Sequence, residues 1–93
     1  MDKTFEWDSS KAAQNIKKHR ISFEEAVTVL QDPLGWTFFD PDHSDDESRF
    51  ITIGMSERRR LLFVAHTDRE NRVRILSARR VTPRERKMYE EEN

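Results

Sequence analysis

The sequence predicts one α+β domain over residues 1–93, with a mainly antiparallel sheet, two N-terminal helices packed on it and a C-terminal helix. The chain has 93 residues, of which 34% are hydrophobic, so it can fill one small core. Apolar residues recur at helical spacing in the first third of the sequence, whereas alternation dominates the middle. The last three predicted strands are joined by short links, which permit only antiparallel neighbours. The expected order of elements is β-α-α-β-β-β-β-α.

The first strand and the first helix follow from the opening residues. Thr4 to Trp7 alternate with both aromatic side chains on one face, which predicts a short strand. Asp8 is the expected N-cap of a helix over residues 9–18, because its carboxylate can accept hydrogen bonds from the free amides of the first turn. The inner face of this helix is expected to carry Ala12, Ile16 and His19.

A second helix is predicted directly after the first. Ser22 and Glu25 have the spacing of a capping box, in which each side chain bonds the backbone amide of the other residue. Pro33 ends the helix, because a residue that precedes proline is pushed out of helical geometry. The apolar spacing predicts burial of Phe23, Ala26, Val27 and Leu30.

Four further strands are predicted in the middle of the chain. They are expected at residues 36–39, 50–55, 60–66 and 73–78. Most positions of the third of these are apolar, so it is expected at the centre of the sheet with both faces covered. A polar loop over residues 40–47 precedes the second of them, and residues 56–59 and 68–71 form tight links.

The C-terminal helix has a clear start signal. Thr82 and Glu85 form a second capping box, with proline at the first helical position, where its missing amide hydrogen costs nothing. The helix is expected to reach about Glu91. Met88 and Tyr89 are its only large apolar residues, so partial packing is expected.

Charge divides the chain into two halves, although the formal net charge is only −1. Residues 1–48 carry 5 Lys+Arg against 11 Asp+Glu, whereas residues 49–93 carry 12 against 7. All basic residues of the second half except Lys87 are arginine, whose planar and permanently charged group matches phosphate oxygens. This favours a polyanion or an acidic protein as partner, with solvated strand and turn positions as the alternative.

Composition excludes several classes of protein. Without cysteine there is no disulfide frame, thiolate nucleophile or cysteine zinc site. No apolar run approaches the roughly 20 residues of a membrane span, and the N-terminus lacks the apolar core of a signal peptide, so a cytoplasmic location is expected. The only glycines are Gly35 and Gly54, which excludes a glycine-rich phosphate loop.

No metal or other cofactor is expected. Asp40, Asp42 and Ser44 imitate the start of a calcium loop. Asp45 stands where such a loop needs glycine, and Ile51 stands where it needs glutamate. Magnesium is a weak alternative, since a polar turn explains the same composition. Metal-ligand spacing is absent from the three histidines, His19, His43 and His66.

The remaining side-chain chemistry suits cleavage of RNA. The 2′-hydroxyl of RNA can attack its own neighbouring phosphorus, so the enzyme needs no nucleophile of its own. It must align the phosphate, transfer protons and stabilise the extra negative charge, and arginine is suited to the last of these. Candidates for the proton transfers are His19, Glu47, His66 and Tyr89.

An ordered series of short motifs resembles the BrnT toxin family over nearly the whole chain. The motifs are Phe5-Glu6-Trp7-Asp8, Lys11-Ala12, Asn15, Lys18-His19, Ile21-Ser22-Phe23, Glu25-Ala26, Glu47-x-Arg49, Ile53-Gly54-x-Ser56, Arg74-Ile75-Leu76-Ser77-Ala78-Arg79-Arg80, Glu85-Arg86 and Tyr89. One departure is Arg20, which stands where glycine is usual in the family.

The resemblance implies a RelE-like fold and a metal-independent ribonuclease that arrests translation, as the toxin of a type II toxin–antitoxin pair. It also implies a partner similar to BrnA, a ribbon-helix-helix antitoxin through which the complex binds operator DNA and represses its own operon. The expected substrate is mRNA, free or on the ribosome. Two alternatives stay open, a nucleic-acid-binding module without catalysis and an inactive toxin that only binds its antitoxin.

The matched positions supply a set of candidate site residues. The expected catalytic residues are Arg79, Arg49, Glu47, Lys18 and His19. The expected RNA-binding residues are Arg58, Arg59, Arg60 and Arg80. A catalytic centre built from these residues requires Arg49 and Arg79 to lie on one shared basic surface.

Each candidate also has a structural interpretation. Arg79 can pair with a nearby carboxylate, and Glu47 with Arg49 can form a surface salt bridge worth about 0–1 kcal/mol. Cations such as the Lys18-His19 pair are favoured at a helix C-terminus by the helix dipole. Core packing is the favoured interpretation of two further residues, His66 and Tyr89.

Overall fold

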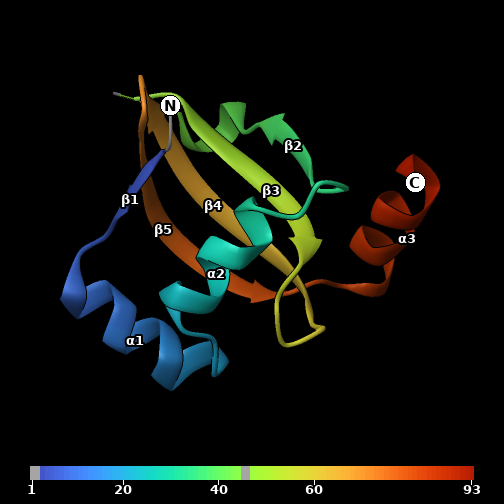
Figure 1. Ribbon diagram of the computed structural model, residues 1–93, viewed down its shortest axis with the longest axis horizontal. Helices are drawn as coiled ribbons and strands as arrows, with labels where there is room; N and C mark the ends of the chain where they lie inside the picture. The colour runs from blue at the N-terminus through green and yellow to red at the C-terminus, as the bar shows by residue number, and fades with distance from the viewer. Residues whose placement is uncertain (1–2, 45–46) are drawn as a thin grey trace.

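The computed structural model describes residues 3–44 and 47–93 (Figure 1). Its elements are β1 (Thr4–Glu6), α1 (Ser9–His19), α2 (Phe23–Leu30), β2 (Trp36–Phe39), η1 (Pro41–His43), β3 (Arg49–Met55), β4 (Leu61–Arg69), β5 (Arg72–Arg80) and α3 (Pro83–Glu92). Helices and strands follow the predicted order, with one short 3-10 turn, η1, inside the predicted polar loop. Asp45 and Asp46 of that loop, including the calcium-loop position considered above, lie outside the described residues.

The five strands form one mixed sheet in the order β1-β5-β4-β3-β2. β1 pairs in parallel with β5, and the other neighbours are antiparallel. β4 lies at the centre, which confirms the position predicted from its apolar sequence. The α+β class and the mainly antiparallel sheet are therefore those expected.

The hairpin between β4 and β5 is tighter than predicted. Backbone pairing continues to Arg69 opposite Arg72, so only Glu70 and Asn71 form the turn, and the predicted link over residues 68–71 is too long. This end of the sheet carries charged side chains, so the apolar alternation ends before the backbone pairing does.

α2 packs against the face of the sheet that is towards the viewer in Figure 1, and α1 lies beside it. Val29 is fully buried, whereas the predicted core residues Val27 and Leu30 are only half-buried. α2 approaches β3 closely at Gly54, where an added Cβ would lie 3.1 Å from Cγ1 of Val29. The core on this face consists of Ile21, Phe23, Ala26, Val29, Leu62, Val64, Ile75 and Ala78.

α1 is tied to the edge of β5 by Asn15, and the predicted inner face of this helix is wrong at Ile16. Ile16 is 46% exposed, whereas Asn15 is 7% exposed. The Asn15 side-chain amide donates to the carbonyls of Ala78 at 2.8 Å and Ile21 at 2.9 Å, and its oxygen accepts from the Ala78 amide at 3.1 Å. Asn15 thus satisfies the backbone of β5 as a neighbouring strand would, which turns Ile16 outward.

One predicted capping box is complete and the other is half-formed. Thr82 and Glu85 exchange both bonds, at 2.9 and 3.2 Å. Ser22 accepts from the Glu25 amide at 3.0 Å, but the Glu25 carboxylate turns away to pair with Arg60. A buried carboxylate gains more from a guanidinium than from a backbone amide, so the predicted return bond of the Ser22 box is absent.

Arg20 ends α1 in a left-handed conformation with a φ of 61°, and its amide bonds the carbonyl of Ile16. Glycine adopts this conformation without the Cβ penalty. We expect Arg20→Gly to raise the free energy of unfolding by about 0.5–1 kcal/mol, measured by urea denaturation. Lys17→Gly, inside the same helix, should lower the free energy of unfolding by about 1 kcal/mol. A decrease for Arg20→Gly would contradict this prediction.

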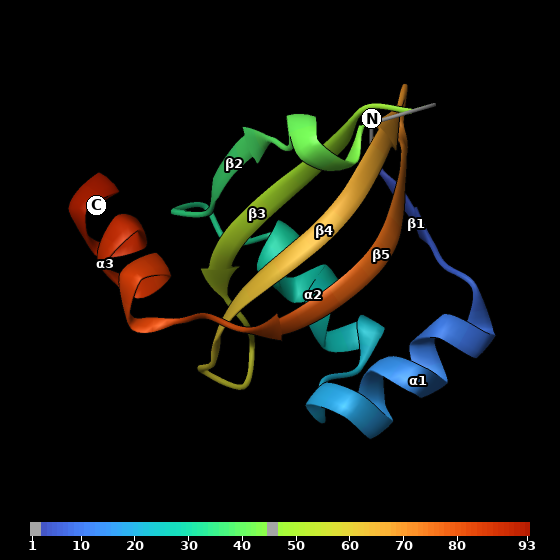
Figure 2. The ribbon, with the colours of Figure 1, turned by 180° about the vertical axis from the view of Figure 1, so that it is seen from behind.

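The opposite side of the sheet, seen in Figure 2, is called the open face and carries Ile51, Phe63 and Arg79. α3 lies beside its β3 end (Figure 2). Tyr89 is buried there and its hydroxyl donates to Asp32 at 2.8 Å, which confirms the partial packing predicted for the C-terminal helix. A second buried cluster lies on this face, formed by Ile51, Ile53, Leu61, Ala65 and Tyr89. Half-buried apolar residues surround it, namely Trp36, Phe38, Phe63, Leu76 and Val81.

Candidate active site

Arg49 and Arg79 both lie on the open face. Arg49 stands opposite Thr67 of β4, and Arg79 stands opposite Phe63. Thr67 and Phe63 are separated by an even number of positions, so all four side chains point to one face. The two arginines are about 13 Å apart along the strand direction, four residues at ~3.3 Å each. They therefore share one surface, as the predicted centre requires.

A groove of about 300 Å³ lies between α1 and the open face, and we call it the α1 groove. It brings together three of the five predicted catalytic residues, Lys18, His19 and Arg49, from distant parts of the sequence. An imidazole beside two cations is a suitable set for binding a phosphate and moving a proton. The groove is lined by Lys11, Gln14, Asn15, Lys18, His19, Arg49, Leu76 and Ser77.

The last turn of α1 supplies one wall of the α1 groove. Lys17, Lys18 and His19 all fall in this turn, where the helix dipole favours positive charge. The bonds from Asn15 to β5 hold this turn against the sheet. His19 is half-buried as a result, while Lys18 is exposed.

Arg49 supplies the opposite wall and carries an unsatisfied donor. Its Nε is buried and has no hydrogen-bond partner within residues 3–44 and 47–93. Oδ2 of Asp40 is 3.9 Å from this Nε and is instead 2.9 Å from Nδ1 of His43. Buried donors of folded proteins are nearly always paired, so a free one beside a groove is a feature of a ligand site.

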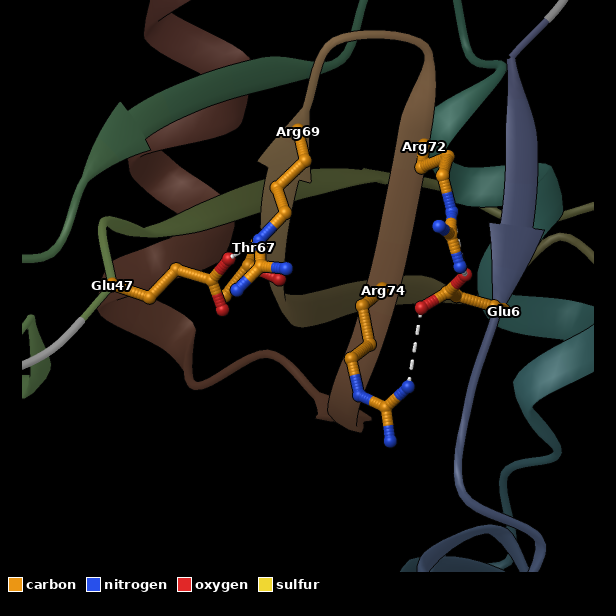
Figure 3. Close-up of a pocket in the computed structure, with 6 residues that line it drawn as sticks. All are labelled: Glu6, Glu47, Thr67, Arg69, Arg72 and Arg74. Carbon is orange, nitrogen blue, oxygen red and sulfur yellow. Dashed lines mark hydrogen bonds and ion pairs between the residues drawn. The ribbon is translucent and has the colours of Figure 1, made fainter.

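A second hollow, of about 280 Å³, lies at the β4–β5 hairpin end of the open face (Figure 3). Glu47 pairs with Arg69 across it, and Glu6 accepts hydrogen bonds from Arg72 at 3.0 Å and Arg74 at 3.2 Å. The bond from Arg72 lowers the pKa of Glu6. Glu47 thus faces Arg69, whereas its predicted partner Arg49 lines the α1 groove.

A β-bulge puts Arg72 and Arg74 on the same face as Arg79, which alternation along β5 does not predict, and Arg69 fell within the predicted link over residues 68–71. The register between β4 and β5 shifts at Ala65 and His66, so that Ala65 pairs with Ser77 while His66 pairs with Ile75. Strict alternation places Arg74 and Arg79 on opposite faces, and the extra residue returns them to the same one. Nothing in the local sequence marks the bulge, which arises from pairing with β4.

Arg79 is held between an aromatic ring and a carboxylate. Its guanidinium carbon lies 3.9 Å from the centre of the Phe63 ring, and its two terminal nitrogens donate to Glu85 at 2.8 and 2.9 Å. Burial acts to raise the pKa of Glu85, but the bonds from Arg79 and the Thr82 amide outweigh it, so this pKa lies below its ordinary value. The planar fork of Arg79 is thereby occupied by the Glu85 carboxylate in a bidentate pair.

The predicted RNA-binding arginines divide into two groups. Arg58, Arg59 and Arg80 are exposed, whereas the Arg60 guanidinium is bound to the buried carboxylate of Glu25, with Nε 2.9 Å from Oε2. A hollow of about 250 Å³, which we call the hairpin hollow, lies beside the β3–β4 turn. It is lined by Met55, Arg59, Arg60, Leu61, Arg80, Val81 and Arg86.

Two of the four proton-transfer candidates, His66 and Tyr89, are buried and hydrogen-bonded to other side chains away from the α1 groove. His66 is buried on the helix side, with Nδ1 2.8 Å from Asp68 and Nε2 2.8 Å from Thr52, and burial lowers its pKa. Burial and the bond to Asp32 raise the pKa of Tyr89 to about 12. His19 and Glu47 are the candidates that reach the open face, in the α1 groove and the hollow of Figure 3.

Two general features of the described residues bear on binding. Within residues 3–44 and 47–93, no three His, Cys, Asp or Glu side chains gather where they would hold a metal ion. No helix in the same ranges combines the length and apolar character that a membrane crossing requires.

Comparisons with known proteins agree with this fold. A solved structure, the Brucella abortus ribonuclease toxin BrnT, has a TM-score of 0.61 at 20% identity, covering 88% of this chain and 99% of that chain. At this identity the likeness concerns the fold, and it confirms the expected architecture. No curated protein matched the sequence. The family model described as "Ribonuclease toxin, BrnT, of type II toxin-antitoxin system" matches residues 7–85. The chain therefore belongs to the BrnT family, the ribonuclease toxins of type II toxin–antitoxin systems.

Proposed function

We propose that this toxin is a metal-independent endoribonuclease that cleaves RNA in the α1 groove and thereby inhibits translation. The observation that carries the proposal is the convergence of Lys18, His19 and Arg49 on one depression. The 2′-oxygen loses its proton and bonds to phosphorus. The bond from phosphorus to the 5′-oxygen of the next nucleotide breaks, and that oxygen takes up a proton. These steps need proton transfer and charge stabilisation.

We assign the roles from position. His19 is the proton-transfer group, because it is half-buried in the groove beside both cations. Lys18 and the unsatisfied Nε of Arg49 bind the scissile phosphate and stabilise its additional charge. Arg79 binds a neighbouring phosphate in place of Glu85, and Glu47 positions Arg69 at the other end of the open face.

Further contacts complete the proposal. Arg58, Arg59 and Arg80 contact the RNA backbone, whereas Arg60 stabilises the fold through Glu25. We propose residues 1–93 as one toxin domain acting in the cytoplasm, neutralised by a BrnA-like ribbon-helix-helix antitoxin. Operator DNA is bound only through that antitoxin, in a complex that represses its own operon.

The test is degradation of labelled RNA by purified toxin in EDTA, for wild type, Arg79→Ala and Lys18→Ala. We expect wild type to cleave, and both variants to lose cleavage while keeping their circular dichroism spectra. Lys17→Ala is the matched control, since it removes a neighbouring exposed charge that does not line the groove. RNA binding without cleavage by wild type would support a nucleic-acid-binding module instead. Binding of the antitoxin without RNA binding and without RNA cleavage would support an inactive toxin that only binds its antitoxin.

A further inference from the structure

We infer that the hairpin hollow is a phosphate-binding site, separate from the α1 groove, that anchors the RNA strand without taking part in cleavage. Three arginines from three segments meet there, Arg59 of the β3–β4 turn, Arg80 at the end of β5 and Arg86 of α3. No carboxylate lines the hollow. The inference deepens the proposed ribonuclease function and rests on it for the identity of the ligand.

The three arginines of this hollow differ in their pairing from the arginines of the open face. On the open face each arginine stands near a carboxylate, as Arg69 does with Glu47 and Arg79 with Glu85. Arg59, Arg80 and Arg86 form no ion pair with any residue of the described part of the chain. Uncompensated cations repel one another, so this cluster is at its most stable with an anion between them.

The backbone around the hairpin hollow is fixed before any ligand arrives. The turn is closed by bonds between Ser56 and Arg60 and between Arg59 and Ser56, both 2.9 Å. The Val81 amide donates to Leu61 at 3.3 Å, which ties the end of β5 to the start of β4. The completed capping box fixes the first turn of α3, which carries Arg86 near its end. Such preorganisation lowers the entropy cost of binding.

Arg59 itself occupies a strained position. Its φ is 61°, in the left-handed region that glycine adopts without penalty. Strain of this kind, of order 1 kcal/mol or more for a side chain with a Cβ, is a feature of functional positions. The guanidinium of Arg59 is exposed and makes no ion pair within the described ranges, so it is available to bind an anion.

The hairpin hollow and the α1 groove are both lined by residues of β5, which is why we infer that the bound phosphate belongs to the RNA strand held in the groove. Ser77 lines the groove and Arg80 lines the hairpin hollow, on one strand of the sheet. Three residues of a β-strand span about 10 Å. Arg79 stands between them on β5. Arg80 stands opposite Leu62 of the helix-covered face, so an RNA strand that runs from the groove to the hairpin hollow passes around the end of β5.

The test measures binding of a 2′-O-methyl RNA oligonucleotide, which cannot be cleaved, across a series of salt concentrations by fluorescence anisotropy. We expect Arg59→Gly, Arg80→Ala and Arg86→Ala each to reduce the slope of log K against log salt by about 0.7, the value for one phosphate contact on a single strand. The KM for cleavage of ordinary RNA should rise in each of these variants, as the loss of a binding contact requires. Arg59→Gly also relieves strain, so a folding defect cannot explain its loss of binding.

Arg84→Ala is the matched control, because it removes the same charge from the same helix, is exposed and does not line the hollow. Equal slopes for Arg84→Ala and Arg86→Ala would overturn the inference, as would weaker antitoxin binding with RNA binding unchanged. Inorganic phosphate is the second probe. Shifts in the Nε–Hε signals of Arg80 and Arg86 with phosphate alone would support the site for free phosphate, and shifts that need the oligonucleotide would support it for the RNA strand.

The same experiment separates this inference from the proposed function. If neither wild type nor any variant cleaves RNA but the salt slopes of the variants differ from wild type as expected, the ribonuclease proposal fails and the anion site stands. If wild type cleaves and the slopes do not differ, the α1 groove stands and the anchoring site is overturned.

Discussion

His19→Gln is expected to lower the rate of RNA cleavage by about 10²- to 10⁴-fold, the usual effect of removing a general acid–base group. Glutamine keeps the size and polarity of the side chain but cannot exchange a proton with the substrate. His19 lies half-buried in the α1 groove that Arg49 also lines, so the change removes proton transfer and leaves the phosphate contacts in place. The measurement is single-turnover cleavage of end-labelled RNA in EDTA, with binding followed separately.

The control for this prediction is His43→Gln. His43 has a side chain that is 62% exposed, lies on η1 and does not line the groove, so its replacement should leave the cleavage rate within about twofold of wild type. Equal rates for His19→Gln and wild type would remove His19 from the reaction. Loss of RNA affinity with an unchanged rate at saturation would make His19 a binding residue instead.

Arg60→Ala is expected to lower the free energy of unfolding by about 3–5 kcal/mol, because it leaves a buried carboxylate without its counter-ion. The Glu25 side chain is 3% exposed and is bound by the guanidinium of Arg60 and by the Ser56 hydroxyl at 2.7 Å. Urea denaturation measures the change. Arg58→Ala, at an exposed position of the same turn, should stay within about 0.5 kcal/mol of wild type.

Acid titration gives an independent check on the same pair. The hydrogen bond from Arg60 is the largest cause of the lowered pKa of Glu25, and burial opposes it. Below pH 4.5, the ordinary pKa of a glutamate, the Glu25 carboxyl is protonated in the unfolded chain but still ionised in the folded chain. The free energy of unfolding therefore falls as the pH falls. We expect Glu25→Gln to show a shallower loss of stability below pH 4.5 than wild type. An unchanged slope would place the acid sensitivity in other carboxylates.

Local signals predicted the elements, whereas contacts between distant residues decided what each face carries. The Thr82–Glu85 capping box involves neighbours in sequence, and it forms as expected. Glu25 has the same local pattern with Ser22, but its carboxylate is taken by Arg60, which the sequence places far away. Tertiary partners override a local preference whenever they satisfy a buried charge better.

The candidate site shows the same division. The motifs predicted Lys18, His19 and Arg49, and the structure places these three in one groove. Arg74 was missed because the bulge opposite Ala65 changes the face of every residue on its far side. A register shift of this kind depends on the partner strand, so no pattern within β5 alone predicts it.

The Asn15 amide has a further consequence for how the toxin behaves in a crowded solution. β1 covers β5 from Arg72 to Arg74, and farther along the same border a single side chain binds the Ala78 backbone on both its carbonyl and its amide. An edge strand with unpaired backbone groups can pair with strands of other chains, which leads to aggregation. Asn15 therefore occupies the backbone groups to which the strand of another chain would bind at this edge of β5, a protection for which many proteins use lysine or proline.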